Sequence, residues 1–108
     1  MHVQIINFRL AGASPEAYAN LCESLAPEFA ALPGLTAKVW LADRDGNSYG
    51  GVYLWESREA MEAFARTDLF RSVATHPALA EVTSRDFSVL DAPTEVTRGF
   101  AQRVAQPA

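Results

Sequence analysis

The stretch LTAKVWLADRDGNSYGGVYLWE, residues 35–56, decides the fold. Two runs rich in β-branched and aromatic residues, Leu35–Ala42 and Tyr49–Glu56, flank a short polar loop that contains Asp45-Gly46. Alternating apolar runs around an Asp-Gly pair are a strong short-range hairpin signal. The stretch therefore predicts two antiparallel strands joined by a tight turn.

The register of this hairpin decides which side chains share a face. With Asp45-Gly46 at the centre of the turn, Trp40 faces Gly51 and Lys38 faces Tyr53; a slip of one residue would exchange the partners. In this register one face is largely aromatic around a single lysine, and the other is aliphatic. The first face carries Lys38, Trp40, Gly51, Tyr53 and Trp55, and the second carries Val39, Leu41, Val52 and Leu54.

Strand and helix signals continue on both sides of the hairpin. Ser14-Pro15 is a helix start, and an apolar stripe at steps of three and four follows it until Pro33-Gly34. Ser57 is a second helix start. The expected elements are a strand at 2–10, a helix at 15–32, strands at 35–42 and 49–56, a helix at 58–67 that restarts at 68 and stops at His76-Pro77, and a strand at 80–90.

The order strand, helix, hairpin, helix, strand predicts an α+β, ferredoxin-like βαββαβ fold, with two helices on one face of a four-stranded antiparallel sheet. In the first strand, Val3, Ile5 and Asn7 point one way, and Ile6 and Phe8 point the other. Two helices cover only one face of such a sheet, yet the strands are apolar on both. A second copy of the chain is the simplest cover, so we expect a homodimer.

Composition excludes several classes of protein. The chain has 108 residues with a net charge of −4, which allows one domain and argues against nucleic-acid or anionic-membrane partners. Its single cysteine and two histidines form no recognisable metal site. Without a long apolar run or a signal-peptide pattern, we expect a cytoplasmic protein.

The C-terminal residues form a separate feature. Val96, Phe100 and Val104 recur at four-residue steps between Pro93 and Pro107. We expect a domain at 1–92 and a tail at 93–108 whose Phe100 packs against the partner subunit. The alternative is a frayed terminus.

Few residues are candidates for chemistry, since no phosphate loop or nucleophile motif is present. Lys38 is the only lysine, and its position among aromatic residues suits an anchor for an anion or phenolate; alternatively it extends to solvent with its stem on Tyr53. Asn7 could orient a ligand or oxygen, or could bond a neighbouring backbone group. His76 lies either on the surface or at a pocket mouth.

The hairpin resembles a known family. Pro33-Gly34-Leu35, Lys38-Val39-Trp40, the run GGVYLW at 50–55 and Ser57-Arg58-Glu59-Ala60 are similar to the YdhR-type monooxygenases, over roughly residues 3–92. These belong to the dimeric α/β-barrel superfamily, with the antibiotic-biosynthesis and haem-degrading monooxygenases. The resemblance implies a homodimer with sheets face to face, and a pocket between sheet and helices. It also implies oxidation of aromatic molecules by O₂, often without metal or flavin.

The haem-degrading branch uses an Asn on the first strand, a Trp on the second helix and a His after it. Asn7 matches the first, but Phe64 stands at the Trp position and Ala74 at the His position, with His76 two residues beyond. The resemblance therefore favours an aromatic monooxygenase over a haem degrader.

The leading hypothesis is a cofactor-independent monooxygenase acting on a small aromatic or quinol-type molecule. Lys38 would stabilise the substrate anion, and Asn7 would orient oxygen or substrate. One alternative is a non-catalytic dimer that binds a hydrophobic molecule in the same pocket, and another is a dimer whose pocket is filled by its own side chains. The expected substrate-binding residues are Trp40, Tyr53, Trp55, Phe64 and His76.

Overall fold

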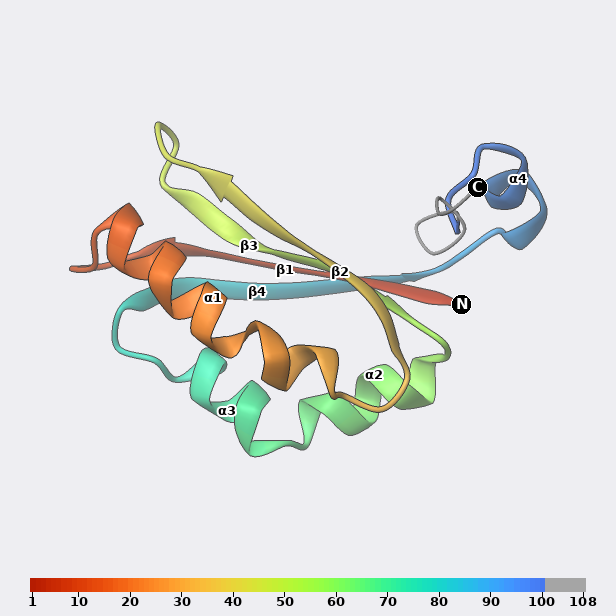
Figure 1. Cartoon of the computed structure of the whole chain (residues 1–108), viewed down its shortest axis with the longest axis horizontal. Coiled ribbons are helices and arrows are strands. Elements are labelled where there is room, and N and C mark those ends of the chain that lie inside the picture. Colours follow the sequence, from red (N-terminus) through yellow and green to blue (C-terminus); the bar gives the residue numbers. More distant parts are fainter. Residues whose placement is uncertain (101–108) are drawn as a thin grey trace.

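The computed structural model of the chain, described here for residues 1–100, contains four strands and four helices (Figure 1). The order of elements expected from the sequence is confirmed, with one short helix added after the last strand. The elements are β1 (His2–Leu10), α1 (Pro15–Ala30), β2 (Leu35–Asp43), β3 (Ser48–Trp55), α2 (Arg58–Ala65), α3 (Asp68–Ala74), β4 (Leu79–Ser88) and α4 (Asp91–Val96).

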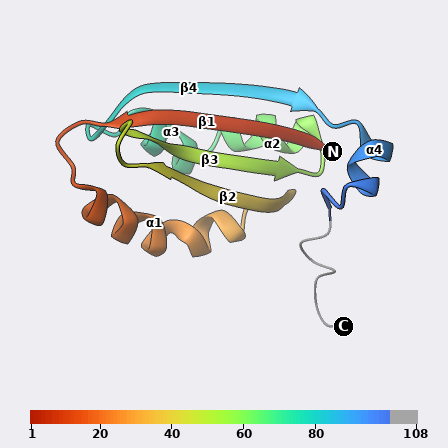
Figure 2. The same ribbon diagram turned by 90° about the horizontal axis from the view of Figure 1, so that it is seen from above.

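The strands form one antiparallel sheet in the order β2-β3-β1-β4. Helices α1, α2 and α3 all lie on one face of this sheet, and the other face is bare (Figures 1 and 2). This is the ferredoxin-like arrangement that the element order predicted. Within residues 1–100, no helix is long and apolar enough to cross a membrane.

The hairpin has the register that the sequence predicted. Lys38 pairs with Tyr53, and Trp40 pairs with Gly51. The last pair before the turn joins Asp43 to Ser48, so Asp45-Gly46 occupies the centre of the connection. The Asp43 carboxylate accepts a hydrogen bond from the Gly46 amide at 3.2 Å and so stabilises the turn.

Side-chain caps begin three helices, two of them at expected positions. The Ser14 hydroxyl accepts from the amide of Ala17 at 3.0 Å, and Ser57 does the same for Ala60 at 3.1 Å. Thr67 caps α3 through the amide of Phe70 at 3.1 Å. This third cap, absent from the predicted boundaries, explains why α2 ends at Ala65 rather than continuing to Thr67.

The core between sheet and helices is mainly aromatic. Trp55 is fully buried and stacks on Tyr53 with ring centroids 5.9 Å apart. The Trp55 indole donates a hydrogen bond to the side-chain oxygen of Gln4 at 3.0 Å, and the side-chain NH₂ of Gln4 donates to the Ser84 hydroxyl at 3.0 Å. The buried polar side chain of Gln4 is thus satisfied on both ends, as a low-dielectric interior requires.

The bare face of the sheet is apolar over much of its area. Across the strands, Phe87 pairs with Val3, and Val3 pairs with Leu54. Val39 is 56% exposed and Phe87 is 43% exposed, although both belong to regular strands. Among residues 1–100, no helix covers this face of the sheet (Figure 2).

A helical turn, α4, lies beyond the end of β4, where the tail begins (Figure 2). Val96 is 77% exposed, whereas Phe100 is half-buried. Val104, the last residue of the expected stripe, lies outside the described residues.

Candidate functional site

A cavity of about 170 Å³ lies between the sheet and helices α1 and α3. Aromatic and aliphatic side chains of β1, α1 and β3 make up most of its wall, and Lys38 of β2 supplies an amine. An open groove of about 520 Å³ between α1 and β2 shares Tyr18, Cys22 and Trp40 with this cavity. The two spaces are therefore adjacent on the same flank of α1.

The Lys38 ammonium is held by aromatic rings. Its Nζ atom lies 3.2 Å from the centroid of the Trp40 ring, 3.5 Å from that of Phe29 and 4.7 Å from that of Tyr53. None of the ion pairs found within residues 1–100 involves Lys38. The amine is therefore contacted by ring faces rather than by a carboxylate.

This environment changes the protonation of Lys38. Burial among apolar side chains lowers the pKa of its ammonium to about 7, and the opposite influence of the Cys22 thiol is smaller. Burial disfavours the charged form because the pocket replaces water with groups of low polarity. At neutral pH the side chain is present both as ammonium and as amine.

Burial keeps two tyrosine hydroxyls and one thiol of the pocket uncharged at neutral pH. Burial raises the pKa of the Tyr18 and Tyr53 hydroxyls and of the Cys22 thiol. His76 also lines the cavity, and its Nδ1 accepts a hydrogen bond from the backbone amide of Ala78 at 3.1 Å. That bond assigns the proton of the neutral imidazole to Nε2.

Four of the residues predicted from the sequence meet at this cavity: Lys38, Trp40, Tyr53 and His76. Trp55 and Phe64 do not line it. Their rings lie 5.3 Å apart in the closed core, and each stacks against Tyr53. They hold Tyr53 in place rather than offering a surface to a ligand.

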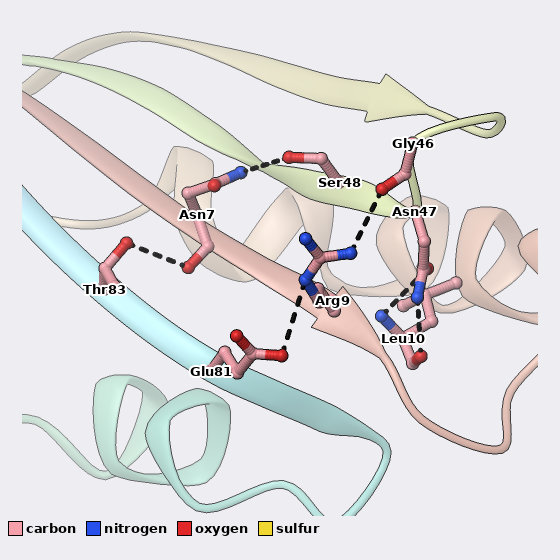
Figure 3. Close-up of polar contacts among 8 residues, drawn as sticks. All are labelled: Asn7, Arg9, Leu10, Gly46, Asn47, Ser48, Glu81 and Thr83. Atoms are coloured by element: carbon pink, nitrogen blue, oxygen red, sulfur yellow. Dashed lines mark hydrogen bonds and ion pairs between the residues drawn. The ribbon is translucent and has the colours of Figure 1, made fainter.

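Asn7 is not brought to the cavity, which corrects its expected position beside Lys38. Its side chain is on the bare face of the sheet, because strand alternation directs Ile6 and Phe8 toward the helices. The Asn7 amide donates to the Ser48 hydroxyl at 2.9 Å (Figure 3). It also donates to the backbone carbonyl of Tyr49 at 2.8 Å. This is the backbone-bonding alternative that the sequence left open.

Sequence reasoning missed three wall residues as functional candidates. Tyr18, Cys22 and Phe29 belong to the apolar stripe of α1, which indicated a buried helix face but not a ligand. Phe29 is the residue that completes the aromatic cage around Lys38. The helical spacing of these three residues was the available signal. If the helix covers the face of the hairpin that carries Lys38, then its apolar stripe faces Lys38.

The comparison with protein families decides the affiliation of the chain. The family described as "Putative mono-oxygenase ydhR" matches residues 3–100. The chain belongs to this family. The sequence resemblance, which rested on the hairpin motif, is thereby confirmed over nearly the whole described chain.

Solved structures of an oxygenase, a haem degrader and a monooxygenase-like protein share the fold of this YdhR-family chain. A variant of SnoaB from Streptomyces nogalater, described as a cofactor-independent oxygenase, is 26% identical, with a TM-score of 0.63 over 82% of this chain and 93% of its own. The haem degrader MhuD from Mycobacterium tuberculosis is 22% identical, with a TM-score of 0.67 over 83% and 96%. A monooxygenase-like protein from Deinococcus radiodurans is 10% identical, with a TM-score of 0.70 over 85% and 95%. Among curated proteins there is no match.

Proposed function

We propose that this YdhR-family protein is a cofactor-independent monooxygenase that oxidises small phenols or quinols with O₂. The observation that carries the proposal is the Lys38 amine in its cage of Phe29, Trp40 and Tyr53. Family membership and the likeness to SnoaB support the reaction class.

The proposed oxygenation needs a substrate that is easily oxidised. A neutral Lys38 amine takes the proton of the phenol hydroxyl and becomes an ammonium beside the phenolate that it creates. In an apolar pocket this ion pair is much stronger than in water, so the phenolate accumulates where O₂ reacts with it.

Without a cofactor, the substrate must supply all of the electrons. A phenol with a free para position satisfies this condition, because one phenol and one O₂ give one quinone and one water. One oxygen atom enters the ring, the other leaves as water, and no external reductant is consumed. The ring hydrogen and the hydroxyl proton are the two protons of that water.

The size of the site limits the substrate. A cavity of about 170 Å³ accommodates one ring, because benzene fits an apolar cavity of about 150 Å³. A larger ring system would have to extend past Trp40 into the groove between α1 and β2. We therefore expect phenols and hydroquinones of one or two rings to be the preferred substrates.

Oxygen uptake with a panel of phenols and hydroquinones tests the proposal. Uptake by the wild type should fall by at least about 100-fold in Lys38→Met, because the variant has neither the base nor the cation. Arg66→Met, which removes an exposed cation of the helix layer, is the matched control and should retain full uptake. Equal uptake in Lys38→Met and wild type would overturn the proposal, and tight binding without any uptake would assign a non-catalytic binding protein instead.

The bare face of the sheet supports a homodimer. We propose that two copies pack through this face, since Val39 and Phe87 lie exposed on regular strands. An interface of about 800 Å² per subunit is a standard size for a stable complex. Sedimentation at micromolar concentration should therefore show about twice the chain mass.

Val39→Asp tests this interface with little risk to the fold, because the side chain is already exposed in one chain. Two buried, unpaired carboxylates at the interface should raise the dimer dissociation constant by at least about 100-fold. Ala63→Asp places the same charge on the exposed side of α2 and should leave dimerisation unchanged. A monomeric wild type, or identical association of both variants, would contradict the assignment of this face.

A further inference from the structure

The position of Lys38 in the sheet makes its amine reachable from two sides. The side chain lines the closed cavity beneath α1, and it also lines a shallow opening of about 330 Å³ between the end of α1 and β2. Gly51 is the diagonal neighbour of Lys38 on β3, where a Cβ atom would come within 2.8 Å of the Lys38 Cε atom. The missing side chain at position 51 lets the lysine lie flat across the hairpin, with its amine between the rings.

The groups around this amine leave it available as a nucleophile. The other ionisable groups of the cavity are the hydroxyls of Tyr18 and Tyr53, the thiol of Cys22 and the imidazole of His76. Among these described residues there is no carboxylate that would keep the ammonium protonated. Burial lowers the pKa of Lys38 to about 7, which leaves roughly 10³ times more free amine at neutral pH than an exposed lysine has.

We propose that Lys38 binds small aromatic aldehydes covalently and reversibly, as an imine inside the cavity. This chemistry goes beyond the oxygenation proposed above and needs no O₂. The Lys38 amine adds to the carbonyl carbon, and the resulting carbinolamine loses its hydroxyl as water to form the C=N bond. No oxidant or reductant is involved, and hydrolysis reverses the step.

The walls of the site define the class of aldehyde. The rings of Phe29, Trp40 and Tyr53 surround the amine, so a flat aromatic group attached to the carbonyl would stack where the cage is open. The cavity volume admits a benzaldehyde but not a bulky ketone. Formation of the imine removes the cation that could pair with a negatively charged ligand. An uncharged aldehyde therefore avoids leaving an unpaired anion in an apolar site.

Reductive trapping tests the proposal, and the composition of the chain makes the result unambiguous. Since Lys38 is the only lysine, the N-terminal amine is the only other primary amine present. The purified wild type would be incubated with benzaldehyde and cyanoborohydride, without oxygen, and the modified residue would be located by peptide mass mapping. We expect a single adduct on Lys38, formed at half its maximal rate near pH 7.

The matched control is the double variant Lys38→Arg with Arg66→Lys. It keeps the total charge and the single lysine, but places that lysine on the exposed helix layer. Its labelling at neutral pH should be at least about tenfold slower than that of Lys38, with a rate that still rises above pH 9. Should the double variant fail to fold, the pH profile and the mapped site in the wild type decide the proposal alone.

Three results would overturn the proposal: equal rates for Lys38 and the introduced lysine, an adduct only on the N-terminus, or a wild-type rate that follows an ordinary lysine titration. The outcome is separable from that of the oxygenase proposal. An oxygenase that is not labelled refutes only the imine site, and a labelled protein that takes up no O₂ refutes only the oxygenase.

Discussion

Replacing Trp55 by alanine is expected to lower the free energy of unfolding by about 3–5 kcal/mol. The side chain is fully buried, stacks on Tyr53 with the two rings nearly parallel, and lies 5.3 Å from Phe64. Removing it leaves a cavity at the centre of the aromatic core that neighbouring rings fill poorly. Urea unfolding followed by circular dichroism, at one fixed protein concentration, measures the difference.

Trp55→Phe separates packing from hydrogen bonding in this prediction. The phenyl ring keeps most of the volume but leaves the Gln4 carbonyl oxygen without its indole donor, which should cost about 1–3 kcal/mol. Trp40→Phe is the control, since no hydrogen bond from the Trp40 indole is found in the described chain. A loss below about 1 kcal/mol for Trp55→Ala would mean that this core is not the main source of stability.

The same variants separate a supporting residue from a binding residue. Trp55 was expected from the sequence to contact substrate, whereas the structure places it behind Tyr53. If the cavity binds the ligand, Trp55→Phe should leave ligand affinity nearly unchanged, and Trp40→Phe should weaken it.

The fold could be predicted because its signals are local. Asp45-Gly46 fixes the hairpin register, and the caps at Ser14 and Ser57 fix two helix starts. The predicted order of elements left helices for only one face of the sheet. The other face therefore had to be bare in a single chain, although its strand residues are apolar. The start of α3 at Asp68 was also predicted, although the Thr67 side chain that caps it was not identified from the sequence.

Apart from His76, the residues of the candidate site that could be predicted come from one hairpin. Lys38, Trp40 and Tyr53 share a face through a register that the turn determines. Asn7 was misplaced because combining it with Lys38 requires knowing which face of β1 aligns with which face of β3. The pairing of Asn7 with Gly50, rather than with Gly51 or Tyr53, puts it on the opposite face, and no local signal contains that information.

Phe29 shows the remaining limit. Its position on an amphipathic stripe indicated burial, but its contact with the Lys38 amine depends on how α1 crosses β2. The lowered pKa of Lys38 follows from that crossing as well, since burial is its largest cause. Tertiary packing, and not composition, lowers the pKa of this strand lysine.

Lys38→Met is expected to stabilise the folded chain at neutral pH, although it removes the residue proposed to carry the chemistry. An unfolded chain protonates Lys38 with a pKa near 10.5, and the folded chain does so near 7. Below about pH 7 both states hold the proton, so the folded state bears the full cost of burying an ammonium. Methionine has a similar length and no charge, and it bears none of that cost.

The sign of the pH dependence follows from proton counts. Between about pH 7 and pH 10.5 the unfolded wild type holds a proton that the folded wild type has lost, so the stability of the wild type rises with pH. Lys38→Met lacks this dependence. Its stability advantage should therefore be greatest at or below pH 7, and should narrow steadily as the pH approaches 10.5.

Urea midpoints of the two proteins, compared at several pH values across that window, measure the effect. The tyrosines of the pocket are present in both proteins, so their titration largely cancels in the difference. Arg66→Met is the control, and its difference from the wild type should stay flat across the window. A constant advantage for Lys38→Met would mean that Lys38 titrates as an exposed lysine, and a widening advantage would mean that folding raises its pKa. Either result would remove the basis for its role as a base at neutral pH. A variant that is more stable than the wild type but inactive would show that the lost activity comes from the amine and not from unfolding.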